Sequence, residues 1–303
     1  MKALIVGAAG MIGTKLVHHL LQDDAWRSRL SRLDLLDIVS APPAPSDTVT
    51  VNSQVGSLTD AAVISRIAAA RYDIIIHLAA IVSGEAERDF SKGWTINAKA
   101  SWNLLEALRQ QHEASGGTYC PRFVCASSLA VFGPPFPDII PDDFRCAPMT
   151  SYGAQKAVME LLVSDHSRKG HIDGISLRLP TICVRPGKPN AAASSFYSSI
   201  IREPLSGQRA RLPVDTSLRH WFASPRSAAG FLAHAASIKL DALGGSRALN
   251  LPGVSCTVEE QIEALRAVAG DEAVALIDHE PDADIQAIVN HWPRNFDPST
   301  FEG

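Results

Sequence analysis

The chain begins MKALIVGAAGMIG (residues 1–13), and the glycines of this stretch, Gly7, Gly10 and Gly13, are spaced three residues apart. The apolar run 3–6 before them has the composition that a buried parallel strand requires. After them, apolar residues recur at helical spacing, at Leu16, Val17, Leu20 and Leu21. The stretch therefore predicts a strand, a glycine turn and a helix.

A glycine turn between a strand and a helix can serve either of two purposes. It can cradle a phosphate, because the first N–H groups of a helix point outward at the positive end of its dipole, and glycines let a pyrophosphate approach the backbone. It can also be a tight turn packed against the sheet, since short glycine patterns occur without a ligand. In the first case, the expected ligand contacts are Gly7, Gly10, Met11, Ile12 and Gly13.

An acidic residue at the end of the second strand favours the phosphate cradle. Dinucleotide sites place such a residue about 20 residues after the glycines, where it accepts hydrogen bonds from the adenosine ribose. The strand-like run 33–39 predicts Asp37 at the carboxyl end of a strand and Asp34 in its middle, as a structural residue. A carboxylate at position 37 repels the 2′-phosphate of NADP, and no Lys or Arg follows it closely, so NAD is favoured.

The composition is that of an ordinary globular protein. The 303 residues include 46% hydrophobic and 20% charged residues, with a formal net charge of -4. The lack of a basic run argues against nucleic acid or an anionic membrane surface as partner. No apolar stretch reaches the roughly 18 residues of a membrane span, and the first strand begins at residue 3, which leaves no room for a signal peptide. We expect a cytoplasmic protein.

The cysteines and histidines lack the spacing of a metal site or a disulfide framework. The five cysteines form no C-x-x-C pair and are odd in number. His18 and His19 are adjacent, so they face apart on a helix, and His77 lies in an apolar strand. We therefore expect no metal site, and we assign these histidines a structural role.

Strands and helices alternate along the first two thirds of the chain. The patterns, in chain order, are a strand near 49–51, a helix near 60–70, a strand at 72–78, a helix at 97–111, a strand at 122–126, a helix at 152–168 and a strand at 175–179. This alternation predicts an α/β fold, a doubly wound parallel sheet of the Rossmann type with helices on both faces. We assign residues 1–180, with a returning segment near 218–236, to this NAD-binding domain.

The last third of the chain predicts a small C-terminal cap. Thr257-Val-Glu-Glu260 is a capping box that opens an amphipathic helix, and Gly270 ends that helix. A second amphipathic helix carries Ile285, Ile288, Val289 and Trp292. Residues 181–303 are therefore expected to form a substrate-binding cap over the carboxyl edge of the sheet.

The sequence Ser-Tyr-Gly-Ala-Gln-Lys (151–156) contains a candidate catalytic pair. Tyr152 and Lys156 are four residues apart on a predicted helix, so their side chains share one face. A phenol is a poor base at neutral pH, but a neighbouring ammonium stabilises its anion, which makes Tyr152 a candidate general base. Upstream, Ser127 and Ser128 follow a strand, where a hydroxyl can donate to the reacting oxygen; a helix or turn cap is the alternative role for either serine.

Together these motifs resemble the extended short-chain dehydrogenase/reductase family over nearly the whole chain. The motifs are Gly7-x-x-Gly10-x-x-Gly13, Asp37, His77-Leu-Ala-Ala80, Asn97, Ser128 and Tyr152-x-x-x-Lys156. The resemblance implies that a triad of Ser128, Tyr152 and Lys156 carries out hydride chemistry with NAD, while Ser127 supports it from behind. It also implies cofactor contacts from Ser57, Leu58, Leu78, Ala79, Ala80, Asn97, Tyr152, Lys156, Pro180, Thr181 and Ile182.

The sequence departs from the wider family in three ways. Gly56-Ser57 stands where Gly-Asp is usual after the third strand, which puts an adenine contact in doubt. The segment 178–182, Arg-Leu-Pro-Thr-Ile, lacks the Asn-Val step that is common in sugar-nucleotide epimerases. The C-terminal section is also shorter than theirs.

Three segments, 78–87, 178–182 and 219–222, resemble the bacterial D-erythronate dehydrogenase branch of this family. That resemblance implies oxidation of the C2 hydroxyl of a four-carbon sugar acid by NAD, giving the 2-oxo acid. A small carboxylate needs a cationic clamp, which Arg185 or Arg219 can supply, although Arg185 can equally be a surface arginine. The expected substrate contacts are Ser83, Ser128, Tyr152, Arg185 and Arg219.

The sequence is also compatible with two alternative functions of this fold. Nucleotide-sugar epimerases and dehydratases use the same triad but keep NAD tightly bound and return the hydride. A non-enzymatic NAD-sensing scaffold is a further alternative, which the intact triad disfavours.

Relatives pair the helices near 97–113 and 152–168 across a two-fold axis, and a homodimer is predicted from apolar residues there, Ala98, Trp102, Leu105, Val158, Leu161 and Leu162.

Overall fold

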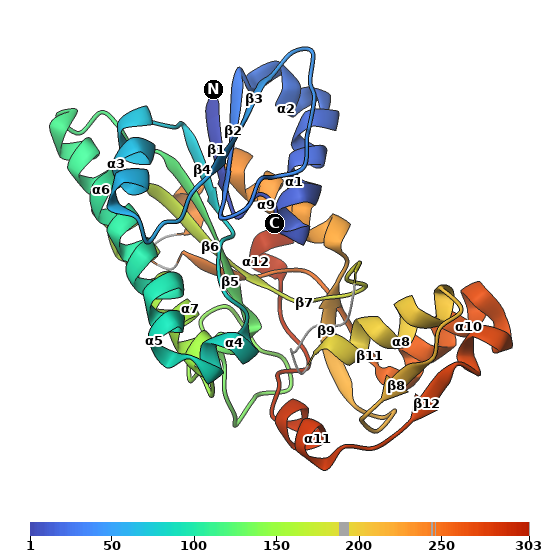
Figure 1. Cartoon of the computed structure of the whole chain (residues 1–303). Coiled ribbons are helices and arrows are strands. Elements are labelled where there is room, and N and C mark those ends of the chain that lie inside the picture. The colour runs from blue at the N-terminus through green and yellow to red at the C-terminus, as the bar shows by residue number, and fades with distance from the viewer. Residues whose placement is uncertain (188–193, 244, 246, 303) are drawn as a thin grey trace.

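The structure is a computed structural model that describes residues 1–187, 194–243, 245 and 247–302. Within these residues, a seven-stranded parallel sheet of order β10–β6–β5–β4–β1–β2–β3 forms the centre of the molecule (Figure 1). Its strands are β1 (Lys2–Val6), β2 (Arg32–Asp37), β3 (Thr50–Val55), β4 (Ile74–His77), β5 (Arg122–Ser128), β6 (Asp173–Leu179) and β10 (Ala248–Asn250). The expected doubly wound α/β fold is confirmed.

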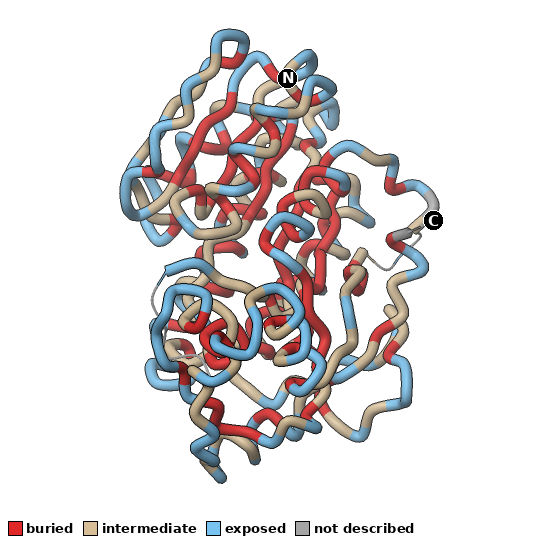
Figure 2. The backbone as a smooth tube through the Cα atoms, turned by 90° about the vertical axis from the view of Figure 1, so that its right-hand side faces the viewer, coloured by how far each residue is buried: buried red, intermediate tan, exposed pale blue. Residues whose placement is uncertain are grey.

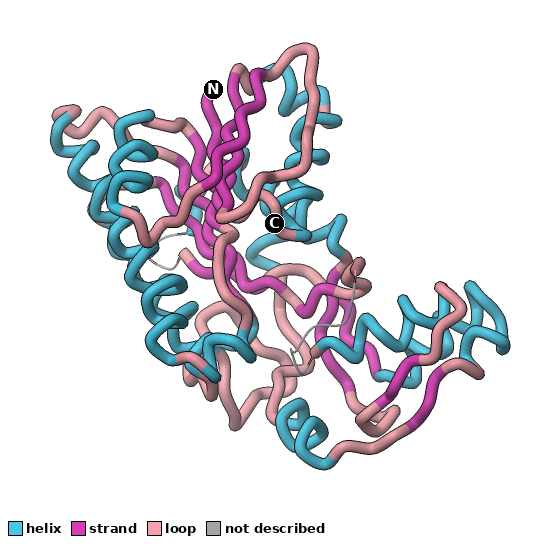
Figure 3. Tube along the Cα trace, viewed as in Figure 1, coloured by secondary structure: helices cyan, strands magenta, loops and turns pink. Residues whose placement is uncertain are grey.

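Helices cover both faces of the main sheet (Figure 3). One face carries α3 (Ala61–Ala70), α6 (Ala100–Ala114) and α7 (Ser151–Arg168), and the other carries α1 (Met11–Gln22), α2 (Asp24–Arg29) and α9 (Pro225–Ser237). Between β4 and α6 lie α4 (Ser83–Arg88), α5 (Phe90–Gly93) and a π-helical turn, Trp94–Lys99. No helix in the described ranges combines the length and apolar character of a membrane span.

Apart from the edge strand β3, the strands are buried on both sides, because successive residues point to opposite faces and helices cover both faces. Ala3 and Ile5 of β1 belong to the hydrophobic cluster beneath α1 and α9, whereas Leu4 and Val6 belong to the cluster beneath α3 and α6. This double burial explains why β1 and β4 are nearly continuous apolar runs, whereas the more exposed edge strand β3 carries polar residues. Figure 2 shows the main strands as a buried layer inside exposed helix surfaces.

A fully buried carboxylate lies between β2 and β3. Asp34 of β2 is fully buried, and its carboxylate accepts hydrogen bonds from Arg32, Asn52 and Tyr72. A buried carboxylate is stable only when it is paired in this way. Its predicted structural role is confirmed.

A second, smaller lobe contains two small sheets of order β11–β9–β7 and β12–β8 (Figure 1). Its elements are β7 (Thr181–Ile182), α8 (Ser195–Leu205), β8 (Ala210–Leu212), β9 (Arg219–Ala223), β11 (Val254–Thr257), α10 (Val258–Val274), β12 (Ile277–His279) and α11 (Ala283–Asn290). The predicted capping box of Thr257 and Glu260 begins α10, and Gly270, with φ of 79°, interrupts the helix where its end was predicted.

Three segments of the C-terminal third return to the main sheet. Helix α9 packs against α1, within the predicted returning segment. Strand β10 pairs with β6, and Phe301 of α12 (Ser299–Glu302) joins the hydrophobic cluster of α1 and α9. The sequence analysis missed these last two returns, because elements of three and four residues are too short to show a periodic pattern.

Candidate active site

The glycine turn between β1 and α1 combines close packing with an open helix end. A Cβ on Gly7 would lie 2.7 Å from the backbone nitrogen of Ala79, and a Cβ on Gly13 would collide with the carbonyl oxygen of Gly7. Gly10 is exposed and caps α1 without a side-chain hydrogen bond, and the first turn of the helix carries no acidic residue. The turn is therefore packed against the sheet and also suits an anionic group such as a pyrophosphate.

The carboxyl ends of β1 to β4 surround a hollow beside this turn. Asp37 lies at the end of β2, where it accepts hydrogen bonds from Ala9 N (2.9 Å) and Ile38 N (2.7 Å). The hollow brings together five residues that the sequence analysis assigned to the cofactor, Gly7, Asp37, Ser57, Leu58 and Ala79. Four strands separated in sequence thus place these residues at one edge of the sheet, as parallel topology requires.

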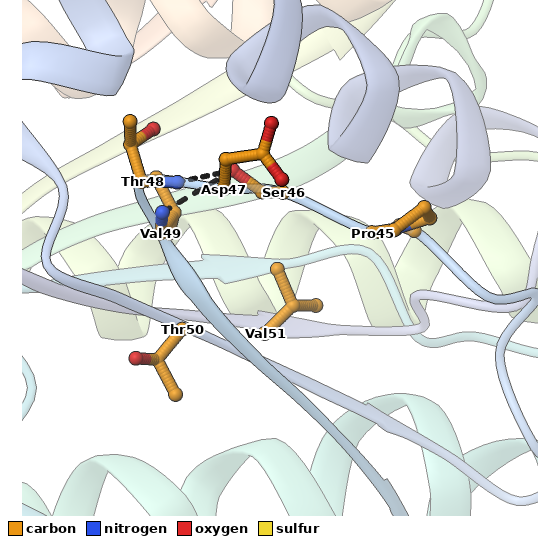
Figure 4. A pocket seen from close by; sticks show the side chains of 8 residues that line it. Pro45, Ser46, Asp47, Thr48, Val49, Thr50 and Val51 are labelled. Carbon is orange, nitrogen blue, oxygen red and sulfur yellow. Dashed lines mark hydrogen bonds between the residues drawn. The ribbon is translucent and has the colours of Figure 1, made fainter.

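A different surface hollow lies around residues 44–51, at the start of β3 (Figure 4). There the Oγ of Ser46 accepts hydrogen bonds from Thr48 N (3.4 Å) and Val49 N (3.2 Å), which shape the turn. Because β3 begins here and runs parallel to β2, this hollow lies at the opposite edge of the sheet from Asp37. It forms no part of the candidate site.

Asn97 connects the segment after β4 to α7. Its side chain accepts from Ile81 N (2.9 Å) and donates to Ile81 O (3.2 Å) and to the Oε1 of Gln155 (2.8 Å). Asn97 lies in the π-helical turn, a local irregularity that often accompanies functional sites. The half-buried residues Leu78 and Ala80 lie on the segment that this amide anchors.

Tyr152 and Lys156 lie on one face of α7, as their spacing predicts. The Nζ of Lys156 is 5.6 Å from the centre of the Tyr152 ring and donates to the carbonyl oxygen of Ala126 on β5 (2.7 Å). The N-terminus of α7 is fixed by Thr150, which accepts from Gly153 N. A buried ammonium beside a phenol is an arrangement that stabilises a phenolate.

The two serines at the end of β5 have different environments. Ser128 is half-buried and accepts a hydrogen bond from Ala130 N (3.2 Å), so the turn-cap role considered for it is also present. Ser127 is buried and donates to the Oε1 of Glu160 on α7 (2.5 Å). Ser127 therefore faces the protein interior behind the site, as predicted.

The two candidate arginines differ in their partners. The guanidinium of Arg185 is half-buried and donates to Ile182 O (3.1 Å) and Ser194 Oγ (3.3 Å), with no ion pair to a carboxylate among the described residues. Burial lowers the pKa of Arg185, and the Tyr152 phenol is close enough to interact with it electrostatically. Arg185 is thus partly exposed and has no carboxylate partner among the described residues, and its role stays a prediction, whereas Arg219 forms an exposed ion pair with Glu260 (3.2 Å).

The segment 180–182 leads from the main sheet into the smaller lobe. The Oγ1 of Thr181 lies 2.7 Å from the Nε2 of His220 on β9, and the His220 ring stacks on Tyr197 of α8 at 5.4 Å. Sequence analysis missed His220 because its partner Thr181 is 39 residues away. Ser83 is the first residue of α4 and is half-buried. It lies two residues after Ile81, whose backbone is hydrogen-bonded to Asn97.

The sequence also matches known proteins. The model of the NAD-dependent epimerase/dehydratase family matches residues 3–230. The chain belongs to this family. That membership confirms the resemblance inferred from the motifs and, at the level of enzyme class, the expected NAD-dependent oxidoreductase.

Relatives and a solved structure refine this placement. The chain is 44% identical to D-erythronate dehydrogenase of Cupriavidus necator, over 97% of the chain and 90% of that protein. It is 40% identical to D-erythronate dehydrogenase of Haemophilus influenzae, over 98% and 91%. A crystal structure described as a nucleoside-diphosphate-sugar epimerase from Agrobacterium tumefaciens superposes with a TM-score of 0.94 at 50% identity, covering 100% of this chain and 88% of that one.

Proposed function

We propose that the chain is an NAD-dependent dehydrogenase that oxidises the C2 hydroxyl of a small sugar acid resembling D-erythronate to the 2-oxo acid. The observation that carries this proposal is the placement of Tyr152, Lys156 and Ser128 at the carboxyl edge of the sheet that also holds the glycine turn. The names of the relatives from C. necator and H. influenzae support the substrate class.

The residues at this edge fit NAD. The open end of α1 at Gly10 to Gly13 suits the pyrophosphate, and Asp37 suits the hydroxyls of the adenosine ribose. We assign the remaining contacts to Gly7, Ser57, Leu58, Leu78, Ala79, Ala80, Asn97, Pro180, Thr181 and Ile182. When bound, NAD supplies the acceptor for the hydride that leaves C2 of the substrate.

In this proposal Tyr152 accepts the proton of the C2 hydroxyl as general base. The Lys156 ammonium, held by Ala126 O, stabilises the phenolate, and Ser128 donates a hydrogen bond to the substrate oxygen. The C2–H and O–H bonds break and a C=O bond forms, so one hydride and one proton leave the substrate. The buried position of Lys156 strengthens its effect on the phenol.

Arg185 is the better candidate of the two arginines for the substrate carboxylate. Its guanidinium lacks a carboxylate partner within the described ranges and lies near the Tyr152 phenol, whereas Arg219 is paired with Glu260. A half-buried guanidinium without an anionic partner can accept one, and a substrate carboxylate would form a charge-assisted pair with it. Ser83 and Arg219 remain secondary predictions for substrate contact.

A nucleotide-sugar epimerase is the second candidate function, because the A. tumefaciens structure carries that description. Such an enzyme would use the same triad but return the hydride, so NADH would not accumulate. An NAD-sensing scaffold without turnover is disfavoured, because the sequence retains all three residues of the proposed triad.

The deciding experiment measures NADH released by the purified protein with C4 aldonic acids, including D-erythronate, and in parallel the epimerisation of UDP- and other nucleotide sugars. We expect NADH from an aldonic acid. Tyr152→Phe should lower that rate by about 10² to 10⁴, the usual contribution of general-base catalysis, with NAD affinity nearly unchanged. Nucleotide-sugar epimerisation without NADH release would replace the dehydrogenase assignment with the second candidate.

We also propose a homodimer formed by α6 and α7. Trp102 is 47% exposed and Leu161 is 72% exposed, so both apolar side chains are available for a partner. Ala98 and Leu105, which the sequence analysis included in this surface, are instead buried within the protomer. The cytoplasmic location stays a prediction from the sequence.

A further inference from the structure

A buried ion pair lies directly behind the proposed catalytic residues. The guanidinium of Arg178 on β6 donates from Nε to Glu160 Oε1 (3.0 Å) and from Nη2 to Glu160 Oε2 (2.9 Å). The two side chains are only 4% and 6% exposed. Removing both charges from water carries a desolvation penalty that their attraction offsets only when the geometry is close to ideal, so a buried ion pair is weak evidence for a purely stabilising role.

Glu160 also joins α7 to the strand that carries Ser128. It accepts a hydrogen bond from Ser127 Oγ (2.5 Å), and one turn earlier on the same helix Lys156 donates to Ala126 O (2.7 Å). These two bonds reach the residues immediately before Ser128 on β5. The position of Tyr152 and Lys156 relative to Ser128 therefore depends on Glu160.

The charge of Glu160 matters as much as its hydrogen bonds. Lys156 and Glu160 are four residues apart on α7, a spacing at which Lys and Glu ordinarily pair with one another. Here Arg178 occupies both carboxylate oxygens, and the Lys156 ammonium is bonded to a neutral carbonyl instead. The ammonium therefore keeps its full electrostatic effect on the Tyr152 ring.

The other titratable groups around this cluster come from several elements. They are Cys125 of β5, His77 of β4, and Asp142 and Cys146 of the loop before α7. Burial raises the pKa of both thiols and of the Asp142 carboxyl, and it lowers the pKa of His77 to about 3. The thiols and His77 are thus uncharged near neutral pH. The charged groups of the cluster are Lys156, Glu160, Arg178 and Asp142, and Arg185 interacts electrostatically with the Tyr152 phenol.

We propose that Glu160 and Arg178 are positioning residues that hold the Tyr152–Lys156 pair against Ser128 and keep the Glu160 charge off Lys156, thereby setting the pH at which proton abstraction begins. The proposal rests on the proposed function, because it assumes that Tyr152 is the base. Neither residue touches the substrate; both act through Lys156 and Ser127.

The proposal predicts opposite effects for the two single variants. In Arg178→Met the released carboxylate of Glu160 turns toward Lys156. The rising limb of the plot of rate against pH should therefore shift to higher pH by about one unit. In Glu160→Gln the uncompensated Arg178 adds positive charge, so the limb should move down by a similar amount. The double variant restores neutrality and should return the limb to within a few tenths of a unit of the unmodified enzyme.

A second measurement does not depend on turnover. Tyrosinate absorbance near 295 nm, titrated with and without Tyr152→Phe, isolates the ionisation of Tyr152. Burial raises the pKa of the other three tyrosines, Tyr72, Tyr119 and Tyr197, so these three ionise at a higher pH than an ordinary tyrosine. The Tyr152 step should shift in the same opposite directions in the two variants.

The controls separate this role from a merely structural one. Asp165→Asn and Arg168→Met remove an exposed ion pair on the same helix and should move neither titration. The proposal would be overturned if both single variants shifted the pH–rate profile and the absorbance titration in the same direction. It would also be overturned if the rate fell while neither titration moved. If Arg178→Met does not fold, Glu160→Gln and the double variant still decide it. Absence of NADH release by the unmodified protein counts against the proposed function, and the absorbance titration still tests this inference.

Discussion

At the residue scale, we propose that the carboxylate of Asp37 sets the choice between NAD and NADP. It lies at the hollow formed by the ends of β1 to β4, beside Ile38 and Ser57. The ribose hydroxyls of NAD can donate to it, whereas the 2′-phosphate of NADP would be repelled. Its two hydrogen bonds, from Ala9 and Ile38, hold the carboxylate facing this hollow and the glycine turn.

Asp37→Ala should weaken NAD far more than NADP. Loss of hydrogen bonds to a charged group costs about 1.5 to 3 kcal/mol, so NAD affinity should fall by about 10- to 100-fold. Asp47→Ala, which removes an exposed carboxylate from the loop before β3, is the matched control and should change neither affinity. Isothermal titration with both coenzymes makes the comparison. An unmodified protein without coenzyme preference would show that Asp37 does not contact the ribose.

The two arginines can be told apart by the same kind of paired substitution. Arg185→Met should raise KM for the sugar acid by about 10- to 100-fold, because a charge-assisted clamp would be lost. Arg219→Met should change KM by less than about threefold, since an exposed pair such as that with Glu260 contributes little. Steady-state kinetics with a carboxylate substrate and with its uncharged amide make the test. Equal KM changes for acid and amide would exclude Arg185 as the clamp.

At the scale of elements, α6 and α7 each present an exposed apolar side chain to solvent, Trp102 and Leu161. The Trp102 ring meets His166 of α7 edge-on, so the two helices carry this surface together. A surface of this kind on a soluble domain usually marks an interface. Because α7 also carries Tyr152 and Lys156, assembly would stabilise the helix that carries the proposed base.

Leu161→Glu should therefore convert the proposed dimer to monomer. A buried carboxylate at the centre of an apolar interface opposes association by several kcal/mol, which raises the dimer dissociation constant by at least about 100-fold. The control is Val268→Glu on α10, because Val268 is 82% exposed and lies outside this surface. Multi-angle light scattering at micromolar concentration reports the mass. A monomer in the unmodified protein would disprove the predicted homodimer.

At the scale of the whole molecule, two buried histidines make the fold sensitive to acid. His77 on β4 shares a hydrogen bond with the Ser101 hydroxyl, and His220 on β9 lies between Thr181 and Tyr197. Burial lowers the pKa of each from 6.5 to about 3. The unfolded chain takes up these protons near pH 6.5 and the folded chain does not, so the stabilisation present above pH 6.5 is lost as the pH falls toward 3.

The free energy of unfolding should fall by about 1.4 kcal/mol per pH unit for each histidine below pH 6.5, or about 2 kcal/mol each at pH 5. His77→Gln should remove one such contribution and flatten the dependence. The exposed His18 provides the control, because His18→Gln should leave the slope unchanged. Urea unfolding between pH 8 and pH 4.5 measures it. A slope that His77→Gln does not alter would mean that His77 is protonated in the folded state.

The sequence by itself determined the features that depend on local spacing. Steric rules that act within a few residues account for the strand, glycine turn and helix at 1–13. They also account for the acid at 37 and for the shared face of Tyr152 and Lys156. The capping box of α10 belongs to the same class. Such patterns are visible because the periods of strand and helix appear directly in the order of apolar residues.

Only the tertiary structure decided which distant residues meet. Arg178 reaches Glu160 across 18 residues, Thr181 reaches His220 across 39, and β10 returns to β6 from the C-terminal third. It also separated the two arginines, leaving Arg185 without a carboxylate partner among the described residues and pairing Arg219 with Glu260. These contacts are set by the packing of whole elements, which is a long-range property. A polar side chain's partner therefore cannot be inferred from its neighbours in sequence.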